Sequence, residues 1–235
     1  MHTGMQGNSS RVQAGSSRRG RSLRHPLPNA SRDPNWPVGP WPQRHPQDWV
    51  GTTEDVLRRL VADLLAAADA KGLSVLAWAS QAGVSRSVAE ACVKGQRWPE
   101  LLTLARLALA VDRRLMLRPR EMSVPHPRWE VMRPSPEYAL LEGEAIAAGD
   151  RAAGWVRIAA LELAWRWDAD RAMASAVARR TGLSAATIGS TVRRSGDGYR
   201  PSFLVFQAVA AHVDCRVVVK GLNALWPVQG CHGAD

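Results

Sequence analysis

Apolar side chains recur every three or four residues along much of this chain, which is the spacing of one face of an α-helix. The first such stretch follows Thr52-Thr53-Glu54-Asp55, whose hydroxyl and carboxylate groups predict an N-cap and a first turn, and Gly72 predicts its end. Shorter helices are expected at about 74–81, 86–94 and 100–110, and a β-strand at 114–118. The apolar positions of the first helix are Val56, Leu57, Leu60, Val61, Leu64, Leu65 and Ala68.

The same pattern occurs a second time, about 100 residues further along the chain. With a displacement of 99, Gly83-Val84-Ser85 aligns with Gly182-Leu183-Ser184. After a three-residue insertion in the turn at 195–199, the displacement becomes 102, and residues 111–117 align with 213–219. Internal repeats of this kind indicate copies of one structural unit. We therefore predict a mostly α-helical protein made of two similar units, each closed by a short C-terminal β-strand.

The residues around the two copies differ from them in composition. Residues 1–50 are rich in Gly, Ser, Arg and Pro and lack periodicity, so we expect a disordered basic tail there. The first unit is expected over 51–120 and the second over 151–223. Between them, 121–150 is expected to be an acidic, proline-containing linker whose second half is rich in helix formers, and 224–235 a C-terminal tail.

Each unit contains two short helices joined by a tight turn. In the first copy Ala79 is small enough for the helices to cross closely, Gly83 can adopt a positive φ, and Ser85 is positioned to cap the second helix. The spacing of residues 73–95 resembles the helix-turn-helix of the lambda-repressor/Cro type, the XRE family, without a gap. Residues 99–108 are similar to the fourth helix of that family.

The resemblance covers about 65–70 residues of each copy, and it implies tandem lambda-repressor-like helix-turn-helix domains. The chain departs from the usual residues of the family at Val75, Trp78 and Ala89, where Gln, Leu and Ile are common. In this motif the second helix enters the major groove of DNA, with residues near its N-terminus against the base edges.

The resemblance also implies which residues contact DNA. Arg86 would bind guanine through two hydrogen bonds, and Glu90 would accept a hydrogen bond from cytosine or repel the backbone. In the first copy the expected contacts are Ser74, Ser85, Arg86, Ser87, Glu90, Lys94 and Arg97. In the second copy they are Ser184, Ala185, Ala186, Gly189, Ser190, Arg193, Arg194 and Arg200. The alanines can contact only a thymine methyl group or permit close approach, so the second copy is expected to read less base information.

Two copies in one chain suggest two arrangements. In one, the strands at 114–118 and 216–220 pair within the chain and form a pseudo-dimer that reads an imperfect palindrome. In the other, each strand pairs with its equivalent in a second chain and forms a homodimer. The sequence leaves both arrangements open.

Charge supports a polyanionic partner. The chain has 31 Lys and Arg against 21 Asp and Glu, a formal net charge of +10. Only three residues are lysine, so a bias of the gene toward arginine codons would explain part of this excess. The charge is uneven, however: +5 over 1–50, +4 over 51–120, −4 over 121–150 and +5 over 151–235. Codon bias does not predict an acidic linker between two basic units.

We therefore expect a sequence-specific double-stranded DNA-binding protein, a transcriptional regulator and not an enzyme, located in the cytoplasm with the nucleoid. We expect no cofactor, no metal and no membrane span, because catalytic motifs and long apolar runs are missing and the three cysteines are scattered. The alternative is an antitoxin-like or assembly protein whose main partner is another protein. The terminal strands, the degenerate second copy and the Trp/Pro stretch at 35–49 motivate that alternative.

Overall fold

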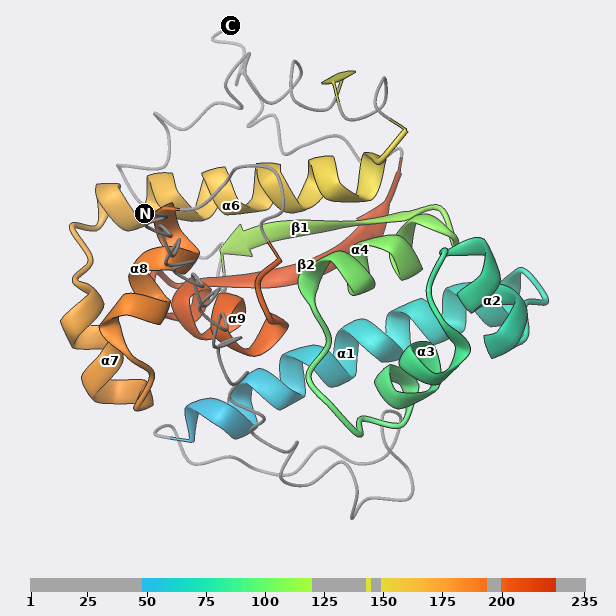
Figure 1. Ribbon diagram of the computed structural model, residues 1–235, viewed down its shortest axis with the longest axis horizontal. Helices are drawn as coiled ribbons and strands as arrows, with labels where there is room; N and C mark the ends of the chain where they lie inside the picture. Colours follow the sequence, from blue (N-terminus) through green and yellow to red (C-terminus); the bar gives the residue numbers. More distant parts are fainter. Residues whose placement is uncertain (1–47, 120–142, 145–148, 194–199, 223–235) are drawn as a thin grey trace, which may run out of the picture.

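The computed structural model describes residues 48–119, 143–144, 149–193 and 200–222 (Figure 1). Within these residues the protein is mostly α-helical, with eight helices and one antiparallel sheet of two strands. The prediction of a mostly helical protein is therefore confirmed. None of the helices in these ranges is long and apolar enough to cross a membrane.

The order of the elements repeats. The first half folds into α1 (Trp49–Ala70), α2 (Val75–Gln81), α3 (Arg86–Val93), α4 (Leu101–Leu109) and β1 (Arg113–Pro119). The second half folds into α6 (Arg151–Ala169), α7 (Ala174–Thr181), α8 (Ala185–Arg193), α9 (Phe203–His212) and β2 (Cys215–Gly221). The three short helices and the strand expected in the first copy agree with these bounds to within about one residue.

The backbone conformation repeats as well. Residues other than glycine uncommonly adopt a positive φ, so shared positions of this kind are a sensitive sign of equivalent folding. Three pairs of equivalent positions have a positive φ: Gly72 and Arg171, Gly83 and Gly182, and Asp112 and Asp214. The two copies therefore turn at the same places, even where their residue types differ.

The two strands are related by a pseudo-twofold axis. They pair antiparallel, and Met116 lies opposite Val218, its equivalent in the second copy. Glu100 and Ser202, which are also equivalent, form an isolated antiparallel bridge. Because both contacts join equivalent positions, the axis passes through both. Of the two arrangements considered for the strands, this structure has the pairing within one chain.

The first helix of each copy packs on the last helix and the strand of the other copy. α1 contacts α9 and β2, whereas α6 contacts α4 and β1. Figure 1 shows α1 and α6 along opposite sides of the strand pair. Leu64 of α1 and its equivalent Leu163 of α6 are both fully buried in one continuous hydrophobic core. The two copies are therefore interlocked through their first helices.

α1 begins earlier than the sequence pattern predicts. Its N-cap is Asp48, whose Oδ1 accepts a hydrogen bond from the N–H of Gly51 at 2.8 Å. The hydroxyl groups of Thr52 and Thr53 instead donate to the carbonyls of Asp48 and Trp49. The prediction of an N-cap at the threonines is wrong, because a threonine bonded inside a helix cannot be distinguished in sequence from one that caps it. The last residues of the expected tail, 49–50, belong to α1.

Several predicted segments lie outside the described residues. They are the rest of the N-terminal tail at 1–47, most of the acidic linker, at 121–142 and 145–148, and the C-terminal tail at 224–235. The expectations for these segments stay predictions.

Candidate nucleic-acid interface

A tight turn brings α3 to the surface beside α2. Ala79 is 1 % exposed and packs in the core. The chain then turns at Gly83, whose φ is +61°, and the N–H of Val84 donates to the carbonyl of Ala79 at 3.0 Å. Ser74 caps α2 by accepting a hydrogen bond from the N–H of Ala77 at 3.2 Å. The positive φ expected at the turn glycine is confirmed.

The inner side of this helix pair is apolar. Trp78 is 1 % exposed, and its Nε1–H donates to the carbonyl of Leu107 at 2.8 Å, which ties α2 to α4. This bond gives the indole of Trp78 a structural role between two helices. Ala89 and Cys92 of α3 are buried, and burial raises the pKa of Cys92 to about 12. The Cys92 thiol is therefore protonated and serves as a core residue.

The outer side of α3 carries the polar residues expected to contact DNA. Ser85 stands at the N-cap of α3 as predicted, but its side chain accepts no hydrogen bond from the helix backbone, so the expected capping bond is absent. Its Oγ lies instead 3.3 Å from the Oγ of Ser87. Glu90 is partly exposed. The exposed members of the predicted set in this copy are Ser74, Ser85, Arg86, Ser87, Lys94 and Arg97. Each of them has a polar side chain that solvent can reach.

Arg86 and Glu90 form an ion pair one helical turn apart. The Nε of Arg86 lies 2.5 Å from Oε1 of Glu90, and the two side chains are 66 % and 33 % exposed. The hydrogen bond to Glu90 raises the pKa of Arg86, and the same bond lowers the pKa of Glu90. This ion pair was not predicted, because each of the two residues was considered only as a contact to DNA. Their i, i+4 spacing on one helix was the signal that predicts it.

α8 presents smaller side chains than α3. Ser184 caps α8 by accepting a hydrogen bond from the N–H of Thr187 at 3.0 Å. Ser190 is half-buried, and its hydroxyl donates to the carbonyl of Thr187 at 2.9 Å. Gly189 is half-buried and Arg194 lies outside the described residues. The exposed members of the predicted set in this copy are Ser184, Ala185, Ala186, Arg193 and Arg200.

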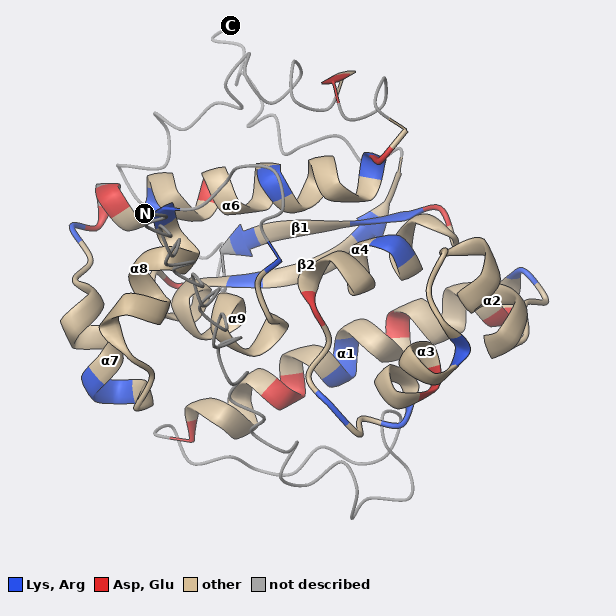
Figure 2. Ribbon diagram, viewed as in Figure 1, with Lys and Arg blue, Asp and Glu red and all other residues tan. Residues whose placement is uncertain are grey.

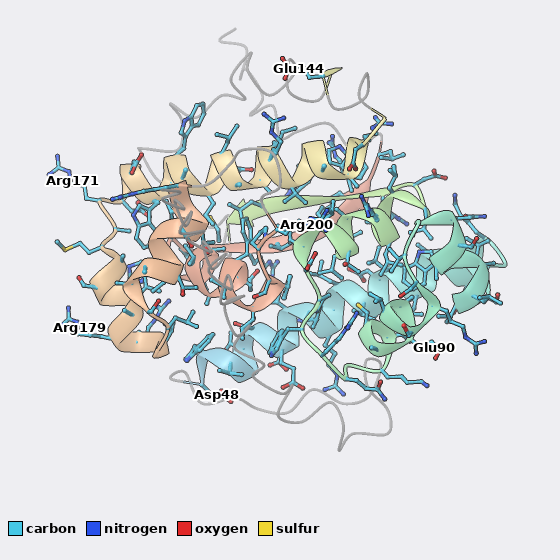
Figure 3. All side chains as sticks on the ribbon, in the orientation of Figure 1. Asp48, Glu90, Glu144, Arg171, Arg179 and Arg200 are labelled. Atoms are coloured by element: carbon cyan, nitrogen blue, oxygen red, sulfur yellow. The ribbon has the colours of Figure 1, made fainter. Side chains whose placement is uncertain are left out.

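α3 and α8 lie toward opposite ends of the strand pair (Figure 1). Lys and Arg side chains occur in the turn after α3 and at the C-terminal end of α7 (Figure 2). Figure 3 places Glu90 and Arg179 toward opposite ends of the molecule, with Arg200 between them. Each exposed helix therefore has basic side chains near it.

A second charged pair, inside the molecule, was not predicted. Arg166 donates to Glu162 on α6 at 2.8 Å, and the two side chains are 11 % and 13 % exposed. Burial raises the pKa of Glu162, although Arg166 opposes that shift. Because α6 packs against β1 here, this pair belongs to the interface between the copies and not to the outer face of α8.

The described residues include no group of three or more His, Cys, Asp and Glu side chains placed to hold a metal ion. The candidate site thus consists of two helices, α3 and α8, whose exposed side chains include hydroxyl groups and cations. No family model, no characterised protein and no solved structure matches this chain.

Proposed function

We propose that this protein is a sequence-specific double-stranded DNA-binding protein, a transcriptional regulator that reads an imperfect palindrome through α3 and α8. The observation that carries the proposal is the symmetry of the strand pair. Met116 faces its own equivalent Val218, so α3 and α8 are related by a pseudo-twofold axis. A DNA duplex has twofold axes of its own, and dimeric helix-turn-helix proteins use this match to place two helices in the major groove.

The surface chemistry of α3 supports the same function. Its inner residues Ala89 and Cys92 account for packing, whereas Arg86, Ser87 and Lys94 are exposed. Arginine and serine are side chains that hydrogen-bond to base edges or phosphates, and lysine binds phosphate. The face of α3 that packing leaves free is therefore suited to a polar, anionic partner.

The overall charge of the chain also supports DNA binding. The formal net charge is +10, and Lys94 and Arg97 after α3 and Arg193 at the end of α8 are exposed, as is Arg200. Proteins that neutralise phosphates release counterions, so their affinity falls with added salt. If about six phosphates are neutralised, the logarithm of the binding constant falls with the logarithm of salt concentration with a slope of about −5.

The experiment is selection of bound duplexes from random DNA by the full chain at physiological salt. We expect an enriched motif with two unequal half-sites. Arg86→Ala should weaken binding to that motif by about 1–3 kcal/mol and relax one base position. Arg193→Ala should weaken binding to all sequences alike, because a phosphate contact carries no base information.

The matched control is Arg113→Ala. Arg113 is an exposed arginine of the same half, but it lies at the start of β1 and not on α3. This variant loses the same charge as Arg86→Ala and should leave base preference unchanged. A wild-type protein that enriches no motif, or an Arg86→Ala variant that binds the motif as tightly as the wild type does, would contradict the proposal.

The alternative of a protein partner gains no support from the described surface. Among the described residues, the large apolar side chains that are exposed are Leu76 and Met173, in different halves of the molecule. Isolated exposed apolar side chains are ordinary on monomeric proteins, whereas docking sites for proteins are contiguous patches. We therefore keep DNA as the proposed partner.

A further inference from the structure

The Arg86–Glu90 ion pair is not explained by stability. Both side chains are exposed, 66 % and 33 %, with Arg86 Nε 2.5 Å from Glu90 Oε1. Solvent-exposed pairs one helical turn apart contribute little to folding. A carboxylate on a surface meant for a polyanion also opposes binding. The ion pair therefore contributes little to folding stability, and the carboxylate of Glu90 on its own would weaken the binding of DNA.

The second copy lacks both members of the pair. The positions equivalent to Arg86 and Glu90 are Ala185 and Gly189. The serine that precedes them is present in both copies, as Ser85 before α3 and Ser184 before α8, although only Ser184 accepts a hydrogen bond from its helix. The arginine and the glutamate are thus present together in one copy and absent together from the other, which is expected if the two act as a unit.

We infer that Glu90 is a positioning residue that holds the guanidinium of Arg86 for one guanine, so that guanine is read in this way in the first half-site only. The inference rests on the proposed function. Arginine has five N–H donors. With Nε bonded to Glu90, both terminal nitrogens stay available, and this is the edge that binds O6 and N7 of guanine.

The same geometry limits what the second half-site can be. Ala185 and Gly189 present no hydrogen-bonding side chain to a base. Arg193 in the last turn of α8 and Arg179 in the last turn of α7 are exposed and suit phosphate. The second copy therefore anchors the protein to the backbone, and the first copy supplies the preference for guanine. The protein therefore binds an asymmetric site in one orientation.

The first test uses Glu90 variants on the motif selected by the wild type. Substitution of Glu90 by Ala should reduce discrimination between guanine and the other bases at one position by about tenfold or more. It should also tighten binding to random-sequence DNA, because a negative charge is removed. Glu90→Gln keeps an acceptor oxygen for Nε and should retain more of the discrimination than Glu90→Ala does. In an Arg86→Ala background, Glu90→Ala should change discrimination no further.

The second test moves the pair into α8. Ala185 is exposed, and a Cβ added at Gly189 would meet no atom within 4 Å, so both substitutions fit. The double substitution Ala185→Arg with Gly189→Glu should create a new preference for guanine in the second half-site, again about tenfold. Ala185→Arg alone is the matched control. It adds a charge without the carboxylate that positions it, and should tighten binding to all sequences alike.

The outcomes separate this inference from the proposed function. If the wild type enriches no motif, the proposed function fails. If it enriches a motif and Glu90→Ala keeps the full preference for guanine, only the positioning role fails. A change of preference at a neighbouring base pair would also overturn it, because Glu90 would then read a base directly. Circular dichroism checks that each variant is folded.

Discussion

At the scale of single residues, Arg171 occupies a backbone conformation that suits glycine better. It follows the C-terminal end of α6 with a φ of 50°, and its equivalent in the first copy is Gly72, with a φ of 66°. A side chain in this left-handed region costs about 1 kcal/mol. We expect Arg171→Gly to raise the free energy of unfolding by about 0.5–1 kcal/mol, measured by urea denaturation.

Gly72→Ala is the matched substitution in the other copy. A Cβ at Gly72 would meet no atom within 4 Å, so crowding does not enter and only the backbone conformation is tested. This variant should lower the free energy of unfolding by about 1 kcal/mol. If the two substitutions changed stability in the same direction, the two positions would not be conformational equivalents.

Single residues also show how far a sequence can be interpreted. The positive φ of Gly83 follows from the tightness of the turn, and the sequence predicts it. The burial of Trp78 follows from its apolar phase, but its bond to the carbonyl of Leu107 does not, because that partner comes from a different helix. The contact between Arg86 and Glu90 could have been predicted from the sequence, because both residues lie on one helix at i, i+4 spacing.

At the scale of elements, the start of α1 distinguishes two capping assignments. Asp48 accepts a hydrogen bond from the N–H of Gly51, whereas Thr52 donates to the carbonyl of Asp48. Removing a capping side chain costs about 1 kcal/mol. We expect Asp48→Ala to lower the free energy of unfolding by about that amount, as measured by chemical denaturation.

Thr52→Ala is the control for the capping prediction. It removes a hydroxyl group from inside the helix and replaces threonine by a better helix former, so the expected change is below about 0.5 kcal/mol. The opposite result, a large loss of stability with Thr52→Ala and a small one with Asp48→Ala, would show that Thr52 is the N-cap, as the sequence pattern predicts.

Periodicity predicts that an element exists and which of its faces is buried, but not what it is buried against. Leu57, Leu60 and Leu64 indicate the inner face of α1, and all three are buried. The helix and strand that they meet, α9 and β2, belong to the other copy. The sequence pattern would be the same if α1 packed on α4 and β1, so the exchange of first helices was beyond prediction from periodicity.

At the scale of the whole molecule, this exchange determines how the protein should unfold. Two units with separate cores would unfold independently. Here α1 packs on α9 and β2 while α6 packs on α4 and β1, and one large hydrophobic cluster contains buried residues of both copies. Unfolding either copy therefore removes the partner of the other copy's first helix. The full chain is expected to unfold in a single cooperative transition.

Leu64→Ala and Leu163→Ala test this expectation as an equivalent pair, one in each first helix. Both leucines are 0 % exposed, so each substitution should cost about 2–5 kcal/mol. In an interlocked molecule each should lower the midpoint of the same transition, followed by circular dichroism during urea denaturation. In a molecule of two independent domains, each would shift one of two transitions and leave the other in place. The second result would mean that the contacts between the copies are too weak to couple their unfolding.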